Sequence, residues 1–382
     1  MIYLDNAATT YPKPTNVENA VRTALKKYGA NPGRSGHKMA METSEMIYNC
    51  RVKLAEFFGG NEPENVIFTL NCTHALNFVI KGILNKGDHI IISQLEHNAV
   101  IRPVHKMKMD NIITYDIAKV YPENTKKTVE SFEELIKPNT RAIICTCTSN
   151  VFGTVMPIKE IGELAKGKGL AFIVDGAQGA GILPINIEQM NIDYLCMPGH
   201  KGLYGPMGTG AIVCREPEIL NTIIEGGTGS LSSKLEQPDF YPDRFESGTV
   251  NAIGIIGLSA GIDFVKSKSV KRIHDHEIKL IKEIRKKLAD NDNIIFYTGE
   301  HNEKFYAPVL SFNIEGIKSE EGALKLNDMG FALRAGFHCA PLAHLSYGTD
   351  KTGTIRVSPS AFNSLNEAEM FCDAVIKIAK NR

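Results

Sequence analysis

Short apolar runs alternate with amphipathic stretches between residues 66 and 213, and this alternation is the feature that most restricts the fold. Several runs are apolar throughout, which is typical of strands that are covered on both faces. Helical patterns separate them, for example at Thr73–Leu84 and Ile158–Lys168. The alternation predicts βαβ units and a mainly parallel sheet. The expected strands are Val66–Thr69, His89–Ser93, Arg141–Cys147, Ala171–Asp175, Tyr194–Met197 and Gly210–Cys214.

The pattern changes after about residue 253, where charged helices and shorter strands follow one another. We therefore expect an α/β fold with a large domain over residues 15–252, and a smaller α+β domain formed by residues 1–14 and 253–382. The elements expected in the smaller domain are helices near Ser269–Leu288, Ser319–Met329 and Leu365–Lys380, and strands near Ile294–Tyr297 and Val309–Ile314.

Charge and targeting signals exclude several classes of function. The 382 residues include 43 Lys and Arg and 43 Asp and Glu, so no broad positive field is available for nucleic acid or an anionic membrane. No apolar run approaches the roughly 20 residues of a membrane span, and the N-terminus lacks a secretory signal. The eight cysteines include no C-x-x-C pair, so we expect reduced thiols, a cytoplasmic location and no metal site.

The most informative segment begins with Asp175 at the end of an apolar strand and continues to Gly-His-Lys at 199–201. In an open α/β sheet, the carboxyl ends of the strands face the ligand crevice. Either residue alone has an ordinary structural interpretation: Asp175 as a turn cap and Lys201 as a loop residue. Together they supply what pyridoxal 5'-phosphate needs, namely a lysine for a Schiff base and a carboxylate that keeps the pyridine nitrogen protonated. Gln178 can donate to the phenolate oxygen of the ring.

These stretches resemble the class V aminotransferase group of fold-type I pyridoxal-phosphate enzymes. The resemblance extends over nearly the whole chain, and it implies the fold-type I transferase fold with that cofactor. The matching segments are Asp175-Gly-Ala-Gln178, Gly199-His-Lys201 with its Tyr-Gly-Pro-x-Gly-x-Gly tail, Tyr3-Leu-Asp-Asn-Ala-Ala-Thr9, Leu95-Glu-His97-Asn, Thr148-Ser-Asn150-Val-Phe-Gly153-Thr and Arg244-Phe-Glu-Ser-Gly-Thr249.

The resemblance also implies particular roles at the cofactor. His97 corresponds to the residue that stacks on the ring, and Asn150 to the residue near the phenolate oxygen and the substrate. The phosphate would be held by Thr73, by the backbone N–H groups of the helix that opens at Thr73 and His74, and by His200, since a helix N-terminus suits a dianion.

The chain departs from the family pattern at the phosphate. Pro198 stands where relatives often carry a serine that donates to the phosphate, and proline has neither a hydroxyl nor an N–H. Cys72 stands where relatives commonly have Thr or Gly, and His74 where they often have Glu. Thr228 lies in a Gly-Thr-Gly-Ser segment that resembles the loop reaching the phosphate of a neighbouring subunit, which implies a homodimer.

Within this group, the segment Arg334-Ala-Gly-Phe-His338-Cys339-Ala is similar to that of group II cysteine desulfurases and selenocysteine lyases. A cation beside a thiol lowers its pKa and favours the nucleophilic thiolate, so Cys339 is the expected sulfur acceptor. Arg356 lies in the last expected strand, where its guanidinium can hold the substrate carboxylate with two parallel hydrogen bonds, aided by Arg334. The alternative for Arg356 is an ion pair that ties the domains together.

We therefore predict a pyridoxal-phosphate-dependent enzyme that converts L-cysteine to L-alanine and leaves the sulfur on Cys339 as a persulfide. Lys201 would remove the α-proton, and a protein of unknown identity would accept the sulfur, for example in iron–sulfur cluster assembly. Three alternatives stay open: a lyase acting on L-selenocysteine, another class V enzyme such as an aminotransferase or epimerase, and a non-enzymatic scaffold.

Overall fold

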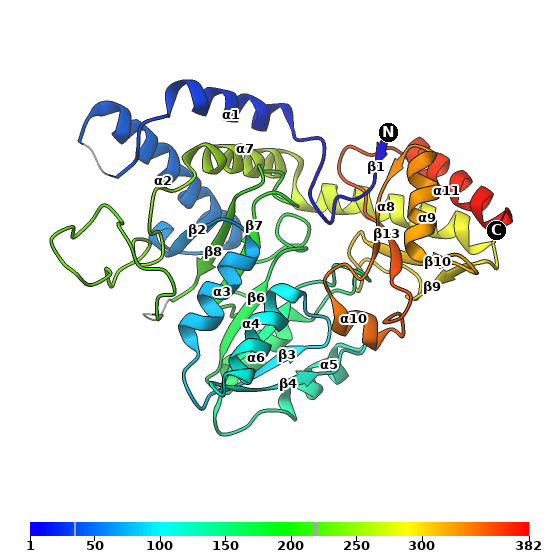
Figure 1. Ribbon diagram of the computed structural model, residues 1–382, viewed down its shortest axis with the longest axis horizontal. Coiled ribbons are helices and arrows are strands. Elements are labelled where there is room, and N and C mark those ends of the chain that lie inside the picture. Colours follow the sequence, from blue (N-terminus) through cyan, green and yellow to red (C-terminus); the bar gives the residue numbers. More distant parts are fainter. Residues whose placement is uncertain (34–35, 217–219, 382) are drawn as a thin grey trace.

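The computed structural model describes residues 1–33, 36–216 and 220–381, and it contains two separate main sheets (Figure 1). The larger sheet has seven strands in the order β2-β8-β7-β6-β5-β3-β4. Neighbouring strands from β7 through β4 are parallel, whereas β8 is antiparallel to both β7 and β2. The prediction of an α/β fold with a mainly parallel sheet is thus confirmed. The strands are β2 (Val66–Thr69), β3 (His89–Ser93), β4 (Thr114–Ala118), β5 (Thr140–Thr146), β6 (Ala171–Asp175), β7 (Tyr194–Pro198) and β8 (Gly210–Cys214).

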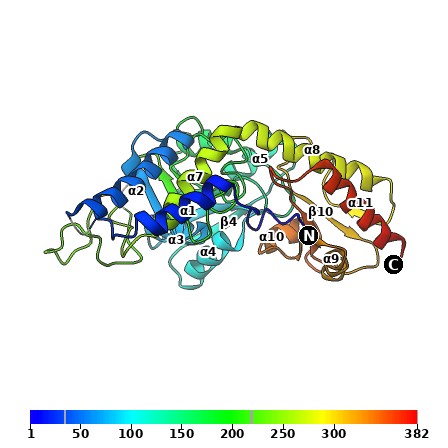
Figure 2. The same cartoon turned by 90° about the horizontal axis from the view of Figure 1, so that it is seen from above.

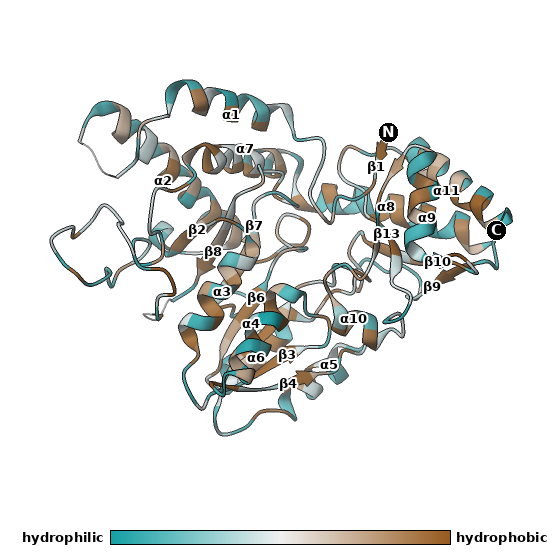
Figure 3. Ribbon diagram, in the orientation of Figure 1, coloured by the Kyte–Doolittle hydropathy of each residue, from teal (hydrophilic) through white to brown (hydrophobic). Residues whose placement is uncertain are grey.

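Helices cover both faces of this sheet, because alternate strand residues point to opposite sides. In β3, Ile91 joins a core with α2 and α6, while Ile90 and Ile92 join a second core with α3 and α4. Figure 3 shows apolar strands between helices whose outer faces are polar. The helices of this part are α1 (Thr15–Lys27), α2 (Lys38–Phe58), the short 3₁₀ helix η1 (Pro63–Asn65), α3 (Cys72–Ile83), α4 (Asn98–Met109), α5 (Thr125–Glu133), α6 (Ile158–Gly167) and α7 (Ala252–Lys268).

The sequence patterns did not reveal β4. This strand lies at the edge of the sheet, where only Ala118 is fully buried and both Thr114 and Ile117 are exposed. An edge strand half open to solvent carries no continuous apolar run, so the signal that identified the central strands is missing here.

The second sheet is antiparallel, has the order β12-β13-β10-β9, and lies at the end of the molecule opposite α1 and α2 (Figure 2). A core that includes Phe312, Val357 and Phe371 fills the space between this sheet and its helices. The strands are β9 (Ile294–Phe296), β10 (Leu310–Ile314), β12 (Arg334–Gly336) and β13 (Thr354–Val357), and the helices are α8 (Val270–Ala289), α9 (Ser319–Asp328), α10 (Pro341–Ser346) and α11 (Leu365–Lys380).

The N-terminus joins this second part of the molecule. Strand β1 (Ile2–Tyr3) pairs in parallel with β11 (Phe331–Ala332), and Leu4 belongs to the core of the small sheet. Helix α7 packs against α1 and α2 on the large sheet. The division into residues 15–252 and residues 1–14 plus 253–382 stays a prediction. No helix of the described residues is long and apolar enough to cross a bilayer.

Gly181 holds the chain close to the turn that carries Lys201. Its φ is +85°, and a Cβ there would lie 2.1 Å from the carbonyl oxygen of Gly202. Gly169 also has a left-handed φ, +68°, but a Cβ there would meet nothing within 4 Å.

We expect Gly169→Ala to cost about 1–2 kcal/mol of unfolding free energy from backbone strain alone. Gly181→Ala should cost about 2–3 kcal/mol more from overpacking. Urea denaturation of both variants measures this difference, and equal losses would contradict the steric argument.

Candidate active site

A cavity of about 110 Å³ lies at the carboxyl ends of the parallel strands, where an open α/β sheet binds its ligands. Residues from β5, β6 and β7 and from the starts of α3 and α4 surround it. The structure therefore brings together seven of the nine residues expected at the cofactor. They are Thr73, His97, Asn150, Asp175, Gln178, His200 and Lys201.

Asp175 and Lys201 line this cavity from the end of β6 and from the turn after the neighbouring strand β7. Asp175 ends β6 with 2% of its surface exposed, and its Oδ1 accepts hydrogen bonds from the Ala177 N–H at 2.9 Å and the Cys72 thiol at 3.3 Å. Lys201 lies in the turn that follows β7. Burial lowers the pKa of the Lys201 amine, although the Asp175 carboxylate acts in the opposite direction. A lowered pKa increases the share of the neutral, nucleophilic amine.

His97 and Asn150 flank the cavity from two loops. His97 caps the start of α4, where its Nδ1 accepts a hydrogen bond from the Ala99 N–H at 3.0 Å. Burial lowers the pKa of His97, which favours the neutral imidazole. Asn150 donates from Nδ2 to the His338 carbonyl at 2.7 Å, so it links the cavity to the loop that carries Cys339.

His200 and Thr73 also line the cavity. Burial lowers the pKa of His200 to about 4, helped by the charges of Lys201 and Lys13. Its Nδ1 is buried and has no hydrogen-bond partner among the described residues. Thr73 lies in the first turn of α3, whose N-cap residue Asn71 accepts from the His74 N–H at 2.9 Å. An orphaned imidazole nitrogen and a helix N-terminus together fit a phosphate group.

Two residues expected at the cofactor lie outside this cavity. The His74 ring packs on Phe78 with centroids 4.2 Å apart, and its Nδ1 accepts from the Leu70 N–H at 3.2 Å. Thr228 lines a different cavity of about 270 Å³, together with Asn31. The side chain of His74 therefore lies outside the cavity, and Thr228 does not line the cavity of its own chain.

Cys339 is the one exposed thiol among the eight cysteines. Burial raises the pKa of the others, for example to about 12 at Cys50. His338 and Cys339 have left-handed φ values of +47° and +55°, conformations that non-glycine residues rarely adopt. The Cys339 carbonyl accepts from the Asn98 N–H at 2.7 Å, beside His97, and Arg334 Nη2 lies 3.6 Å from the Cys339 sulfur.

Arg356 is 1% exposed and lies directly opposite Arg334 in the pairing of β12 with β13. Its Nη2 forms an ion pair with Asp5 at 2.6 Å, and its Nη1 donates to the Asn150 carbonyl at 2.9 Å. The ion pair that the sequence analysis gave as the alternative role of Arg356 is therefore present. The Nε atom of Arg356 is nevertheless buried without a partner among the described residues. Like charges opposite each other on adjacent strands are destabilising, so this pair favours an anion between the two guanidinium groups.

Glu96 is a buried acid that the sequence patterns did not single out. It is 0% exposed, and burial raises the pKa of its carboxyl to about 8. Its Oε1 accepts from the Thr146 N–H at 2.8 Å and from the Ser93 hydroxyl, so it joins the ends of β3 and β5 next to His97. The sequence signal that could have identified Glu96 was an acidic residue closely following the apolar strand His89–Ser93.

The large sheet is mainly parallel, and a lysine, an aspartate and further polar side chains line the cavity at its carboxyl edge. This is the arrangement of a fold-type I pyridoxal-phosphate enzyme. The chain belongs to the class V aminotransferase family, whose sequence model matches residues 2–371. Membership in this family implies the cofactor pyridoxal phosphate.

Similar proteins within that family include several cysteine desulfurases. A probable cysteine desulfurase from Methanothermobacter thermautotrophicus is 31% identical, covering 99% of this chain and 94% of the relative. The apo structure of a cysteine desulfurase from Thermococcus onnurineus NA1 has a TM-score of 0.91 at 31% identity, covering 100% of this chain and 95% of that one. A cysteine desulfurase from Escherichia coli has a TM-score of 0.87 at 26% identity, covering 99% and 94%.

Proposed function

We propose that this protein is a pyridoxal-phosphate-dependent L-cysteine desulfurase. The observation that carries the proposal is the placement of the exposed Cys339 thiol. Its loop is hydrogen-bonded to Asn98 and, through the His338 carbonyl, to Asn150, so it is held against the cavity that contains Lys201. A nucleophilic thiol fixed beside a cofactor site is what sulfur removal from cysteine requires.

The residues of the cavity fit the cofactor. Bound pyridoxal phosphate supplies an electron-accepting ring that stabilises negative charge at the substrate Cα. Lys201 would hold it covalently, and Asp175 would pair with the ring nitrogen while its Oδ1 is fixed by Ala177 and Cys72. His97 would cover one face of the ring, and Gln178 would donate to the phenolate oxygen.

At the phosphate end, His200 Nδ1 and the first turn of α3 at Thr73 would supply the donors. Pro198 and Cys72 line the cavity but bring no hydroxyl there. The Cys72 thiol is instead directed at Asp175, 3.3 Å away. We therefore expect fewer side-chain donors to the phosphate than in relatives with serine and threonine at these two positions.

The chain's own groups then account for the reaction. The Lys201 amine removes the proton from the substrate Cα. The Cys339 thiolate attacks the substrate sulfur; a sulfur–sulfur bond forms as the carbon–sulfur bond breaks, and its electron pair stays on Cβ. Protonation of Cβ and return of a proton to Cα would then yield L-alanine, and Cys339 would keep the sulfur as a persulfide. A thiol on an acceptor protein would then take this sulfur.

The assay is the conversion of L-cysteine to L-alanine and sulfide by the purified protein in the presence of a reducing thiol. Equal amounts of the two products support the proposal. Keto-acid-dependent amino transfer without sulfide would instead support an aminotransferase. L-selenocysteine as a parallel substrate tests the lyase alternative, which predicts a far higher kcat/KM for selenocysteine than for cysteine.

We expect Arg356 and Arg334 to bind the substrate carboxylate. Replacing Arg356 with alanine should raise the KM for cysteine about 10- to 100-fold, because a charge-assisted hydrogen-bond pair contributes about 1.5–3 kcal/mol. The cofactor absorbance should be retained, which shows that the fold survives. Arg272→Ala, at an exposed position of α8, is the control. An unchanged KM and kcat in Arg356→Ala would leave Arg356 with only its structural ion pair to Asp5.

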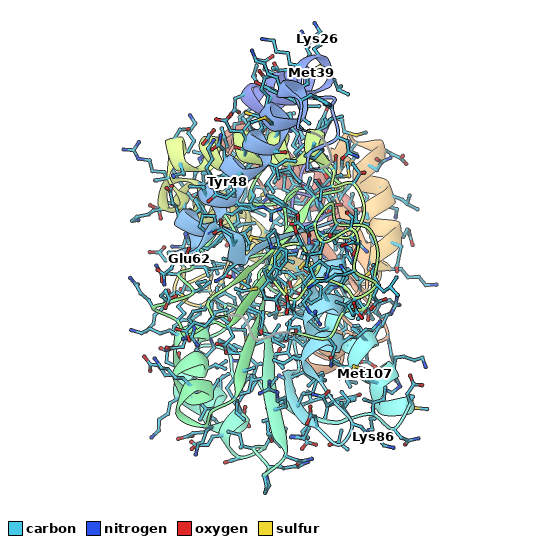
Figure 4. The ribbon with its side chains drawn as sticks, turned by 90° about the vertical axis from the view of Figure 1, so that its left-hand side faces the viewer. Lys26, Met39, Tyr48, Glu62, Lys86 and Met107 are labelled. Atoms are coloured by element: carbon cyan, nitrogen blue, oxygen red, sulfur yellow. The ribbon has the colours of Figure 1, made fainter. Side chains whose placement is uncertain are left out.

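We also propose a homodimer in which Thr228 reaches the phosphate end of the partner's cavity. Thr228 lies away from the cavity of its own chain and lines a different cavity together with Tyr48 of α2. Met39 and Tyr48, labelled in Figure 4, are 57% and 45% exposed on α2. Leu235, in the loop that carries Thr228, is 100% exposed. Burying such a surface favours self-association, and sedimentation equilibrium should give twice the chain mass.

A further inference from the structure

The N-terminal segment of residues 5–13, which we call the strap, lies on the backbone of the turn that carries Lys201. The carbonyl of His200 accepts hydrogen bonds from the Thr9 hydroxyl at 3.1 Å, the Thr10 N–H at 3.1 Å and the Lys13 ammonium at 2.8 Å. The Thr10 hydroxyl also lies 3.2 Å from the carbonyl of Lys201. Donors from the strap therefore converge on the carbonyl groups of His200 and Lys201, two of the residues that line the cavity.

Lys13 is the only cation in this group, and it has no carboxylate partner among the described residues. Its ammonium contacts the Thr10 hydroxyl at 2.7 Å and the His200 carbonyl at 2.8 Å. Burial lowers its pKa to about 8. A partly buried ammonium without an ion pair is costly, so its bond to the carbonyl, which is charge-assisted and therefore strong, is the interaction that holds it there.

The turn itself is tightly constrained on its inner side. Gly199 donates from its N–H to Thr209 at 2.8 Å, and Tyr204 donates to the Lys201 carbonyl at 2.8 Å. A Cβ on Gly199 would lie 2.2 Å from the Thr209 hydroxyl. The His200 carbonyl faces the other way, toward the strap, so the orientation of this peptide depends on the donors that the strap provides.

We propose that Lys13 is a positioning residue that fixes the His200–Lys201 turn through the His200 carbonyl and thereby sets where the Lys201 amine stands in the cavity. The proposal rests on the cofactor roles proposed for these two residues. A catalytic amine displaced by a fraction of an ångström reacts more slowly while its substrate still binds, because positioning acts on the reacting geometry.

Lys13→Met tests this, since methionine keeps most of the aliphatic stem and removes the ammonium. Lys26→Met, at an exposed position near the end of α1 (labelled in Figure 4), is the matched control. We expect kcat for cysteine to fall about tenfold with the KM changed less than about twofold. In the full-length holoenzyme, amide hydrogen exchange of residues 199–205 should rise relative to the control, and Lys13→Arg should restore both properties in part.

The proposal is overturned if Lys13→Met shows the same amide hydrogen exchange of residues 199–205 and the same kcat as Lys26→Met. It is also overturned if Lys13→Met has a lower melting temperature but an unchanged kcat and KM. If Lys13→Met does not fold, Lys13→Gln keeps a neutral donor and gives the same comparison. The exchange measurement does not depend on turnover. A wild-type protein without desulfurase activity therefore refutes the proposed function, while exchange of the turn still decides the role of Lys13.

Discussion

Replacing Lys201 with alanine is expected to remove essentially all turnover of cysteine, by a factor of about 10⁴ or more. The variant loses both the amine that holds the cofactor and the base that takes the α-proton. Burial lowers the pKa of this amine, and no other lysine lines the cavity among the described residues, so no second amine is available there to hold the cofactor. The measurement is the rate of alanine and sulfide formation.

A second readout separates loss of chemistry from loss of structure. Borohydride should fix the cofactor covalently to the wild-type protein and bleach its absorbance band, but it should not attach the cofactor to Lys201→Ala. Lys86→Ala, an exposed position labelled in Figure 4, should behave as the wild type in both assays. A Lys201→Ala protein that still carries a reducible covalent cofactor would falsify the assignment of Lys201.

Replacing Cys339 with serine should lower sulfide release from cysteine by about 10³-fold or more while the cofactor spectrum stays unchanged. A serine hydroxyl is far less ionised than a thiol and cannot form a persulfide. Arg334 Nη2 lies 3.6 Å from the sulfur, so a guanidinium group faces the Cys339 side chain. Undiminished sulfide release from the variant would exclude Cys339 as the sulfur acceptor.

The same variant has an independent chemical test. Cys339 is the only exposed cysteine, and the other seven are buried. Native wild-type protein should therefore react rapidly with one equivalent of iodoacetamide, and Cys339→Ser should show no rapid phase. Rapid alkylation of the variant would mean that another thiol is accessible and competent. Pre-incubation with cysteine should place an extra sulfur on the wild type, visible by mass spectrometry of the intact chain.

Much of the fold and of the cofactor site follows from local sequence patterns. The strands His89–Ser93, Ala171–Asp175 and Gly210–Cys214 have the bounds that their apolar runs predict. A strand buried on both faces needs an uninterrupted apolar run, and such a run can be recognised without its neighbours. Asp175, placed at the end of one of these strands, was therefore expected at the ligand edge, where the structure has it.

Other features depend on which distant segments meet. The sequence contains Asp5, Arg334 and Arg356, but only the packed sheet places the two arginines opposite each other and brings Asp5 within 2.6 Å of Arg356. The orientation of helix α3 about its axis determines that Thr73 lines the cavity while the adjacent His74 packs on Phe78. Side chains next to each other on a helix point in different directions, and the pattern does not say which direction faces the site.

The sequence by itself indicated the class of fold and the Lys201 and Asp175 pair, because each depends on residue type and local periodicity. The candidate thiol followed from its neighbouring residues and from the resemblance of its segment to a known family. Only the tertiary structure decided that Cys339 is exposed while seven other thiols are buried, and that the Lys13 ammonium lies 2.8 Å from the His200 carbonyl. Burial and long-range hydrogen bonds are properties of the packed chain, since they arise when segments far apart in sequence exclude water from one another.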